Sequence, residues 1–385
     1  MDDVKREFYK RKSRLQKAVR LEIPDRVPVF SLNGPEVTLE YAGKDLKTDI
    51  FNFRILAETV PKYYRDMMVD GAGATFFRNP KMYSYLGARN FRQNRDGSMQ
   101  YYDVQGMFES DYEALINSPM KTLIEKILPR IYQSFLLRDK NDFVNLAKGI
   151  IAYHENGNEL DLIDLSSINT FGVPIISDSL VETPFDFLSD QLRGLTGIVT
   201  DMHRRPEQVE AACEVLLPLM VKWGQAGAKR GLSDVPGVFI PLHMPPFLNP
   251  GQFERFYWPT FKKMVDAFTR SGHPVSLFLE GNWSEFYDYL QTFNGQVIGF
   301  FETGDLKVIK EKLGKSICIA GNYPLGVLKS ESTEKCIDIA KEMLDVAAPG
   351  GGYIFSTGKV ILRKSGVDLE KLKAVHRFII ENGKY

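Results

Sequence analysis

The sequence predicts a single (β/α)8 barrel, and three observations lead to this fold class. From about residue 170, short apolar runs alternate with amphipathic helical stretches. Each run is apolar on both faces, as strands are when helices cover both sides of a parallel sheet. Two further runs lie upstream and bring the predicted βα units to eight, the number that closes a barrel.

The predicted strands are short and are separated by helical patterns. In chain order they are RVPVFSLN, DGAGATFFRN, FGVPIISDS, PGVFIPLHM, HPVSLFLEG, GQVIGFFETG, KSICIAGN and GGYIFSTG. A weak internal repeat supports the assignment, because FETG at 301–304 recurs as FSTG at 355–358, and EGN at 280–282 recurs as AGN at 320–322. A glycine just beyond a strand lets the backbone turn sharply into the next loop.

The regions outside the repeating pattern predict an extension and an insertion. The first twenty residues are charged and amphipathic, which predicts an N-terminal helical extension, and they lack the apolar segment of a secretory signal. Residues 81–165 are less regular, with one segment that predicts a hairpin and helical patterns around it. We interpret 81–165 as a capping insertion within one barrel domain that spans residues 1–385.

The composition excludes several classes of protein. The 385 residues are 44% hydrophobic and carry 49 Lys+Arg against 49 Asp+Glu, so the net charge is zero and nucleic acid is not the expected partner. No apolar run approaches the ~20 residues of a membrane span. The three cysteines are far apart, which fits a cytoplasmic protein without disulfides. The oligomeric state stays open, a homodimer included.

Polar residues follow most of the predicted strands, and in such barrels the chemistry lies at the carboxyl ends of the strands. These residues are Asn33, Glu36, Arg78, Asp178, Glu182, His243, Glu280, Asn282, Glu302, Asn322 and Lys359. Glu280 ends an almost continuous apolar run, so we expect its carboxylate to face a cleft. For any one of these residues, capping a helix or forming an ion pair is an equally good interpretation.

His243 is the strongest single candidate among the five histidines. It follows a predicted strand and precedes a helix that begins near Asn249, and a neutral imidazole there could act as a general base, a proton donor or a metal ligand. A half-buried structural histidine explains the pattern equally well. The sequence contains no GxGxxG that opens a helix after a strand, and no P-loop, HExxH, CxxC or GxSxG motif.

Several segments, taken in order, resemble the uroporphyrinogen decarboxylase superfamily, which includes the corrinoid-dependent methyltransferases. They are DRVPVFSLNGPEVTLEYAG, FGVPIISDSL, PVSLFLEGNW, LGKSICIAGNYP and AAPGGGYIFSTGKVI, and the resemblance covers roughly residues 20–380. It implies a barrel fold and an enzyme of one of the superfamily's reaction types.

The departures from these relatives narrow the function. The decarboxylase has an arginine-rich RQAGRY segment where this chain reads SLNGPEV. The position of its catalytic aspartate corresponds to about Phe77 and Arg78 in this chain, and that of its substrate-binding tyrosine to about Leu180. The thiol-activating methyltransferases carry an HxCGN strand end and a later cysteine, where this chain has Phe278 to Asn282 and Lys359. The resemblance therefore implies neither porphyrinogen decarboxylation nor a zinc-thiolate site of that pattern.

The remaining function that the resemblance implies is a corrinoid-dependent methyltransferase. Such an enzyme moves a methyl group from a small methoxylated (aromatic or not) or methylated donor to the cobalt of cobalamin, a corrinoid that a partner protein carries. The catalytic candidates are Glu280, His243 and Glu302, and the substrate-binding candidates are Arg78, Asp178, Phe278, Asn282, Trp283, Asn322 and Lys359. No spacing demands zinc, and His243 and Glu280 are its ligands if it is present. The alternatives are a cofactor-independent decarboxylase that acts on another acid and a non-catalytic ligand-binding or scaffold protein.

Overall fold

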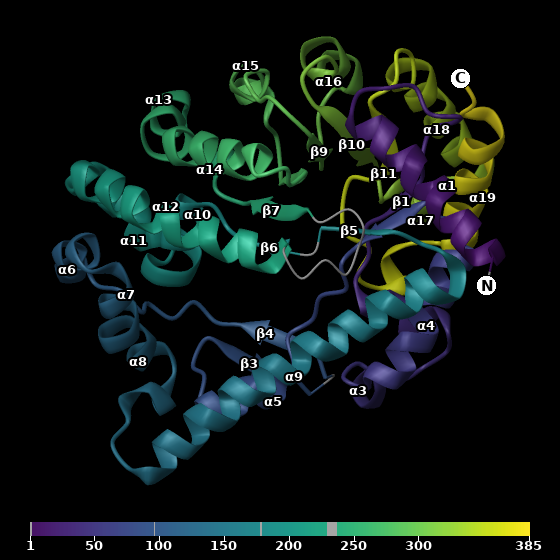
Figure 1. Cartoon of the computed structure of the whole chain (residues 1–385). Helices are drawn as coiled ribbons and strands as arrows, with labels where there is room; N and C mark the ends of the chain where they lie inside the picture. Colours follow the sequence, from purple (N-terminus) through teal and green to yellow (C-terminus); the bar gives the residue numbers. More distant parts are fainter. Residues whose placement is uncertain (1, 96, 178, 229–236) are drawn as a thin grey trace.

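The computed structural model of the chain describes residues 2–95, 97–177, 179–228 and 237–385. Short parallel strands form its centre, and helices surround them (Figure 1). The central strands are β1 (Phe30–Ser31), β2 (Gly71–Gly73), β5 (Ile175–Ile176), β6 (Ser179–Leu180), β7 (Val238–Leu242), β8 (Val275–Leu279), β9 (Val297–Phe301), β10 (Cys318–Tyr323) and β11 (Tyr353–Thr357). Each predicted strand segment overlaps at least one of them, and β5 and β6 share the third segment.

The strands pair in the order of a (β/α)8 barrel. Strands β6 to β11 form one parallel sheet, and β1, β2 and β5 form another. A parallel bridge between Val29 and Phe355 joins β1 to β11, and β5 leads into β6 along the chain. Ser177 follows the last residue of β5 and has a φ of 82°. This left-handed conformation is uncommon for a residue with a side chain and is not that of an extended strand. The predicted fold class is confirmed.

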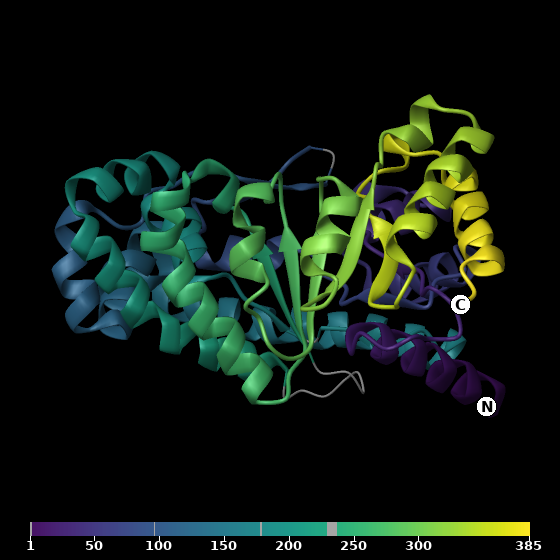
Figure 2. The ribbon, with the colours of Figure 1, turned by 90° about the horizontal axis from the view of Figure 1, so that it is seen from above.

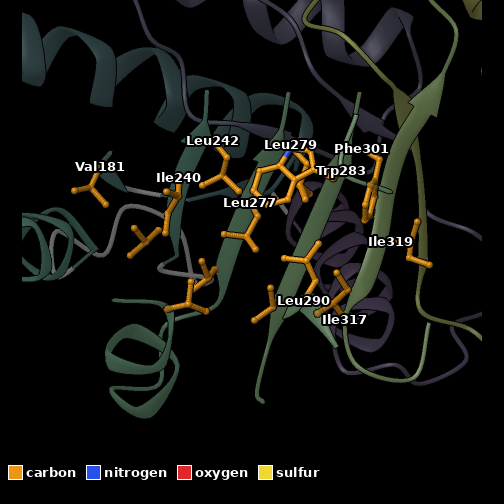
Figure 3. Packing of buried hydrophobic residues seen from close by; sticks show 14 of the residues in the cluster. Val181, Ile240, Leu242, Leu277, Leu279, Trp283, Leu290, Phe301, Ile317 and Ile319 are labelled. Carbon is orange, nitrogen blue, oxygen red and sulfur yellow. The ribbon is translucent and has the colours of Figure 1, made fainter. Parts of the chain in front are cut away.

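Long helices cover the outer face of the strands. They are α4 (Phe53–Asp66), α9 (Lys140–Phe171), α12 (Pro206–Ala228), α14 (Trp258–Arg270), α16 (Leu306–Leu313), α18 (Thr333–Ala347) and α19 (Leu369–Asn382). Several begin where a side chain accepts hydrogen bonds from the first backbone N–H groups, as Asp305 does for α16 and Ser332 for α18. The main core lies between strands and helices; the outward-facing Leu277 and Leu279 of β8 belong to it (Figure 3).

Shorter elements connect the strands and helices. The α-helices among them are α2 (Pro35–Tyr41), α3 (Leu46–Asp49), α10 (Pro184–Asp186), α11 (Leu195–Arg204), α13 (Pro250–Gln252), α15 (Tyr287–Leu290) and α17 (Val327–Ser330). The π-helical turns are η2 (Leu123–Ile127), η4 (Phe187–Arg193) and η6 (Phe253–Tyr257). The 3-10 turns are η1 (Glu109–Asp111), η3 (Gln133–Leu136), η5 (Pro245–Phe247), η7 (Ser284–Phe286) and η8 (Lys364–Gly366).

Helix α1 (Asp2–Val19) closes the end of the barrel at which the strands begin. Its Leu15 and Val19 are buried in the same cluster as Ile176 and Ile298, which point into the barrel. Arg14 Nη1 also forms an ion pair with the buried Asp70 at 2.5 Å, just before β2. The predicted N-terminal helical extension is present, and it forms the floor at this end of the barrel.

The region 81–165 contains the predicted hairpin, made of the antiparallel strands β3 (Phe91–Gln93) and β4 (Met99–Tyr101). Around it lie α5 (Pro80–Leu86), α6 (Tyr112–Asn117), α7 (Pro119–Thr122) and α8 (Leu128–Ile131). Helices α6 to α8 lie on the side of the molecule away from both chain ends (Figures 1 and 2). Helix α9 runs through the predicted boundary at 165 and reaches α4, where Ser166 Oγ donates to the carbonyl of Ala57 at 2.7 Å. The division of the chain at 81 and 165 stays an interpretation.

In the described parts of the chain, no helix is both long and apolar enough to cross a membrane.

Candidate functional site

The register of the parallel ladders determines which side chains share a layer inside the barrel. One layer is paired across neighbouring strands in the order Pro241, Phe278, Phe300 and Ala320. Side chains two positions apart on a strand point to the same face. Two positions further along these four strands lie His243, Glu280, Glu302 and Asn322. A polar layer therefore lies directly above an apolar one, and we call this carboxyl end of the barrel the mouth.

Glu280 is half-buried at the end of β8. Burial raises the pKa of its carboxyl above the usual value; the nearby His243 opposes this shift and Glu302 adds to it. Among the described residues, no side chain or backbone group donates a hydrogen bond to this carboxylate, while its backbone carbonyl accepts one from Trp283 Nε1 at 3.0 Å. A carboxyl whose neutral form is favoured in this way is suited to donate a proton.

Glu302 is tied to two partners across the mouth. Its Oε1 lies 2.7 Å from Lys359 Nζ, and its Oε2 accepts a hydrogen bond from the backbone N–H of Gly281 at 2.9 Å. Burial acts to raise the pKa of Glu302, but the bonds from Lys359 and Gly281 outweigh it and the net pKa is lowered. Glu302 is therefore suited to fix charge and geometry beside Glu280, and it is a poor proton donor.

His243 is oriented by a carboxylate that the sequence did not single out. Its Nδ1 lies 2.9 Å from Asp190 Oδ2 on the π-helical turn η4. This hydrogen bond, against the effect of partial burial, raises the pKa of His243 to about 9. Tyr101 at the end of β4 donates from its hydroxyl to the backbone carbonyl of Asp190 at 2.8 Å. The hairpin therefore reaches the mouth, and at neutral pH the imidazole carries a positive charge.

Two more acids lie behind His243. Burial raises the pKa of Glu182 to about 7, although Gln191 donates to its Oε1 at 2.9 Å. Burial also raises the pKa of the fully buried Asp186 to about 7. Asp186 accepts hydrogen bonds from the hydroxyl of Tyr257 at 2.6 Å and from the backbone N–H of Met244 at 2.9 Å. Because Met244 follows His243, Asp186 fixes the backbone that carries the imidazole.

The sequence contained a signal for these two aspartates. Glu182, Asp186 and Asp190 follow one another at intervals of four residues after β6, which places them on one face of a helix. Only Glu182 ends a predicted strand, so reading the strand ends alone missed Asp186 and Asp190.

The predicted aromatic residues separate into two groups. Phe278 is 8% exposed, points into the barrel and stacks on Phe239 with ring centroids 6.2 Å apart and planes 26° apart. Trp283 is fully buried in the core outside the strands (Figure 3), next to Phe286 and Phe253. The expectation that Trp283 contacts substrate is therefore wrong for this structure. The indole instead contacts the backbone at the end of β8, where its Nε1 donates to the carbonyl of Glu280.

The other predicted binding residues have different surroundings. The guanidinium of Arg78 lies over the rings of Phe76 and Phe91, at 5.1 and 4.7 Å from their centroids, and it acts to lower the pKa of Glu182. Asn322 has a φ of 69° and its Nδ2 donates to the carbonyl of Gly304 at 3.1 Å. Asp178 lies outside the described residues.

Asn282 faces away from the polar layer. Its Oδ1 accepts a hydrogen bond from the backbone N–H of Ser284 at 3.0 Å. It lines a shallow pocket of about 300 Å³ together with Tyr287, Gly304 and Asp305, outside β8 and β9. The structure therefore brings Glu280, His243, Glu302, Lys359 and Phe278 together, but not Asn282 or Trp283.

The donor set at the mouth does not match a metal site. In the part of the chain that the structure describes, no three His, Cys, Asp or Glu side chains are arranged to hold a metal ion. The two predicted ligands, His243 and Glu280, would supply only two such side chains. We derive no step through zinc.

Comparisons with known proteins agree with this fold. A methyltransferase from Methanosarcina mazei superposes with a TM-score of 0.68 at 15% identity, covering 96% of this chain and 98% of that protein. Two proteins named uroporphyrinogen decarboxylase are similar over shorter stretches. The one from Myxococcus xanthus is 32% identical over 133 residues, and the one from Geobacter metallireducens is 28% identical over 115 residues. These stretches cover 34% and 30% of this chain, and 37% and 33% of the two relatives.

The model of the family described as "Uroporphyrinogen decarboxylase (URO-D)" matches residues 171–381, which is more than half of the 385 residues. That range includes the strands that carry His243, Glu280, Glu302 and Lys359. With this match, the chain belongs to the uroporphyrinogen decarboxylase family.

Proposed function

We propose that this protein is a methyltransferase that demethylates a small methoxylated donor and transfers the methyl group to the cobalt of a corrinoid on a partner protein. The observation that carries this proposal is Glu280, a half-buried carboxyl with a raised pKa, next to His243 and above an apolar layer. The methyltransferase from Methanosarcina mazei supports the fold of such an enzyme.

The chemistry requires a proton at the leaving oxygen. When the methyl carbon is attacked, its bond to oxygen breaks and the electron pair stays on the oxygen, which is a poor leaving group until it is protonated. Glu280 would supply that proton and become a carboxylate. The imidazolium of His243 would stabilise the new charge, since it lies close enough to act on the pKa of Glu280.

Glu302 and Lys359 would act as a fixed pair beside the reacting group. Because Glu302 also accepts from the N–H of Gly281, it holds the loop that follows Glu280. The corrinoid would supply the cobalt nucleophile that accepts the methyl group. In this proposal the residues of the chain bind the donor, exclude water beneath it and deliver the proton.

A decarboxylase remains the second candidate, because the two similar curated proteins bear that name. A lyase of that kind must hold substrate carboxylates with cations. In the described part of the mouth, Lys359 is paired with Glu302, and Arg78 lies over two aromatic rings. These contacts favour the methyltransferase.

The test is a methyl-transfer assay with reduced cobalamin, or with a purified corrinoid protein, and a panel of methoxyarenes and methylamines. Formation of methylcobalamin, followed by absorbance, would support the proposal. Release of carbon dioxide from a carboxylic acid, with no methyl transfer to either acceptor, would replace it with the lyase.

A further inference from the structure

We infer that the mouth selects an uncharged methoxyarene and discriminates against the corresponding benzoate and benzylammonium. This inference rests on the proposed demethylation and deepens it by naming the class of donor. Three features of the described residues carry it: the pairing of the cations, the carboxyl without a counter-ion, and the aromatic layer beneath.

The cations of the mouth already have partners. Lys359 Nζ lies 2.7 Å from Glu302 Oε1, and His243 Nδ1 lies 2.9 Å from Asp190 Oδ2. Arg78 lies over the rings of Phe76 and Phe91. A donor with a carboxylate would have to compete with one of these partners, so none of these three cations is ready to serve as its counter-ion.

The remaining acids offer no positive partner to an anion and no full negative charge to a cation. Glu280 has no ion pair among the described residues, and burial favours its neutral form and that of Glu182. A benzoate would lie beside these carboxyls without a counter-ion. A benzylammonium would find Glu302 and Asp190 already paired with Lys359 and His243, and an unpaired charge in a partly buried site is costly.

The layer beneath offers an apolar surface for an aromatic ring. Pro241 in this layer is half-buried, and so is Phe239 one layer below, which stacks on Phe278. Rings favour offset stacking or edge contacts with other rings. Because Lys359 and His243 are paired with acids and the layer beneath them is apolar, the mouth is complementary to a neutral ring that carries a methoxy group.

Isothermal titration calorimetry of the purified full-length chain at pH 7 tests this inference without any corrinoid. The three probes are 4-methoxyphenol, 4-methoxybenzoate and 4-methoxybenzylamine, which share the ring and the methoxy group but are neutral, anionic and cationic. We expect 4-methoxyphenol to bind at least about tenfold more tightly than either of the others. Equal affinities, a reversed order or no saturable binding by any probe would overturn the inference.

A variant gives a second, independent measurement. Glu302→Gln keeps an oxygen for the N–H of Gly281 but releases Lys359, so affinity for 4-methoxybenzoate should rise about tenfold while that for 4-methoxyphenol changes little. The matched control is Asp288→Asn, which removes a carboxylate paired with Lys312 on the outer surface. An equal response of both variants contradicts the inference. Because no methyl acceptor is present, the order of binding is independent of whether methyl transfer occurs.

Discussion

The two ends of the barrel use the same strands in opposite ways. At the end where the strands begin, α1 covers the interior with Leu15 and Val19, and the space left beneath it holds about 10 Å³, room for roughly one water. At the other end, β8 and β9 terminate in Glu280 and Glu302. The comparison shows that the same strands carry apolar side chains at one end of the barrel and polar side chains at the other, because side chains two positions apart stay on the same face.

The acids at the polar end, Glu280 and Glu302, are partly buried, and burial acts to raise the pKa of each. Glu280 has a raised pKa and no ion pair among the described residues. The buried charges near the closed end, Arg14 and Asp70, are instead held together at 2.5 Å. The difference predicts that substitutions at the mouth change activity more than stability and that substitutions at the closed end do the reverse.

The largest effect is expected for Glu280→Gln. The amide keeps the shape of the side chain but cannot donate an acidic proton, so kcat for methyl transfer should fall by about 10²-fold or more while the melting temperature stays nearly constant. The matched control is Glu285→Gln, an exposed acid in the turn that follows. If the variant turns over within a few-fold of the unaltered protein, Glu280 is not the proton donor.

Leu15→Ala should have the opposite signature. The side chain is 1% exposed beneath the barrel, so its truncation leaves a cavity and should lower the free energy of unfolding by roughly 2–4 kcal/mol. Activity well below the melting temperature should be unchanged. Chemical denaturation gives the first quantity and the transfer assay the second; a large loss of kcat in a folded sample would show that the two ends are coupled.

Asp186→Asn tests the buried acid behind His243. The folded pKa of about 7 lies above the ordinary value of 3.8, so the native state holds the proton longer than the unfolded chain and stability falls as pH rises from about 4 to 7. An asparagine does not titrate, and it should reduce this fall by roughly 1–3 kcal/mol between these pH values. Urea denaturation at several pH values measures it, and an unchanged slope contradicts the assignment.

Asp190→Asn should give the smallest effect and the most local one. The hydrogen bond that His243 donates to Asp190 is the main cause of the raised pKa of His243, about 9, so its removal should return that pKa toward the ordinary 6.5. NMR titration of the imidazole measures the change directly. The matched control is Asp305→Asn, in a helix cap outside the barrel, which should leave the pKa of His243 unchanged.

The strand ends could be predicted because each one combines an apolar run with a polar residue. Glu280, Glu302 and Lys359 were identified in this way, and the structure brings them together. Trp283 shows the limit of the method. It follows the same strand and is only three residues beyond Glu280, but the turn at Gly281, with a φ of 68°, is followed by a side chain that packs outside the strands. Sequence distance from a strand end does not fix the direction of a side chain beyond a turn.

The sequence by itself determined the alternating strands and helices, the N-terminal helix, the hairpin and the acids at the strand ends, because these follow from local periodicity and composition. Only the tertiary structure decided which partners those acids have. The pairing of His243 with Asp190, the position of Tyr101 over the same turn and the burial that raises the pKa of Asp186 all join segments far apart in the chain. Such contacts depend on packing and burial, which local sequence patterns do not specify.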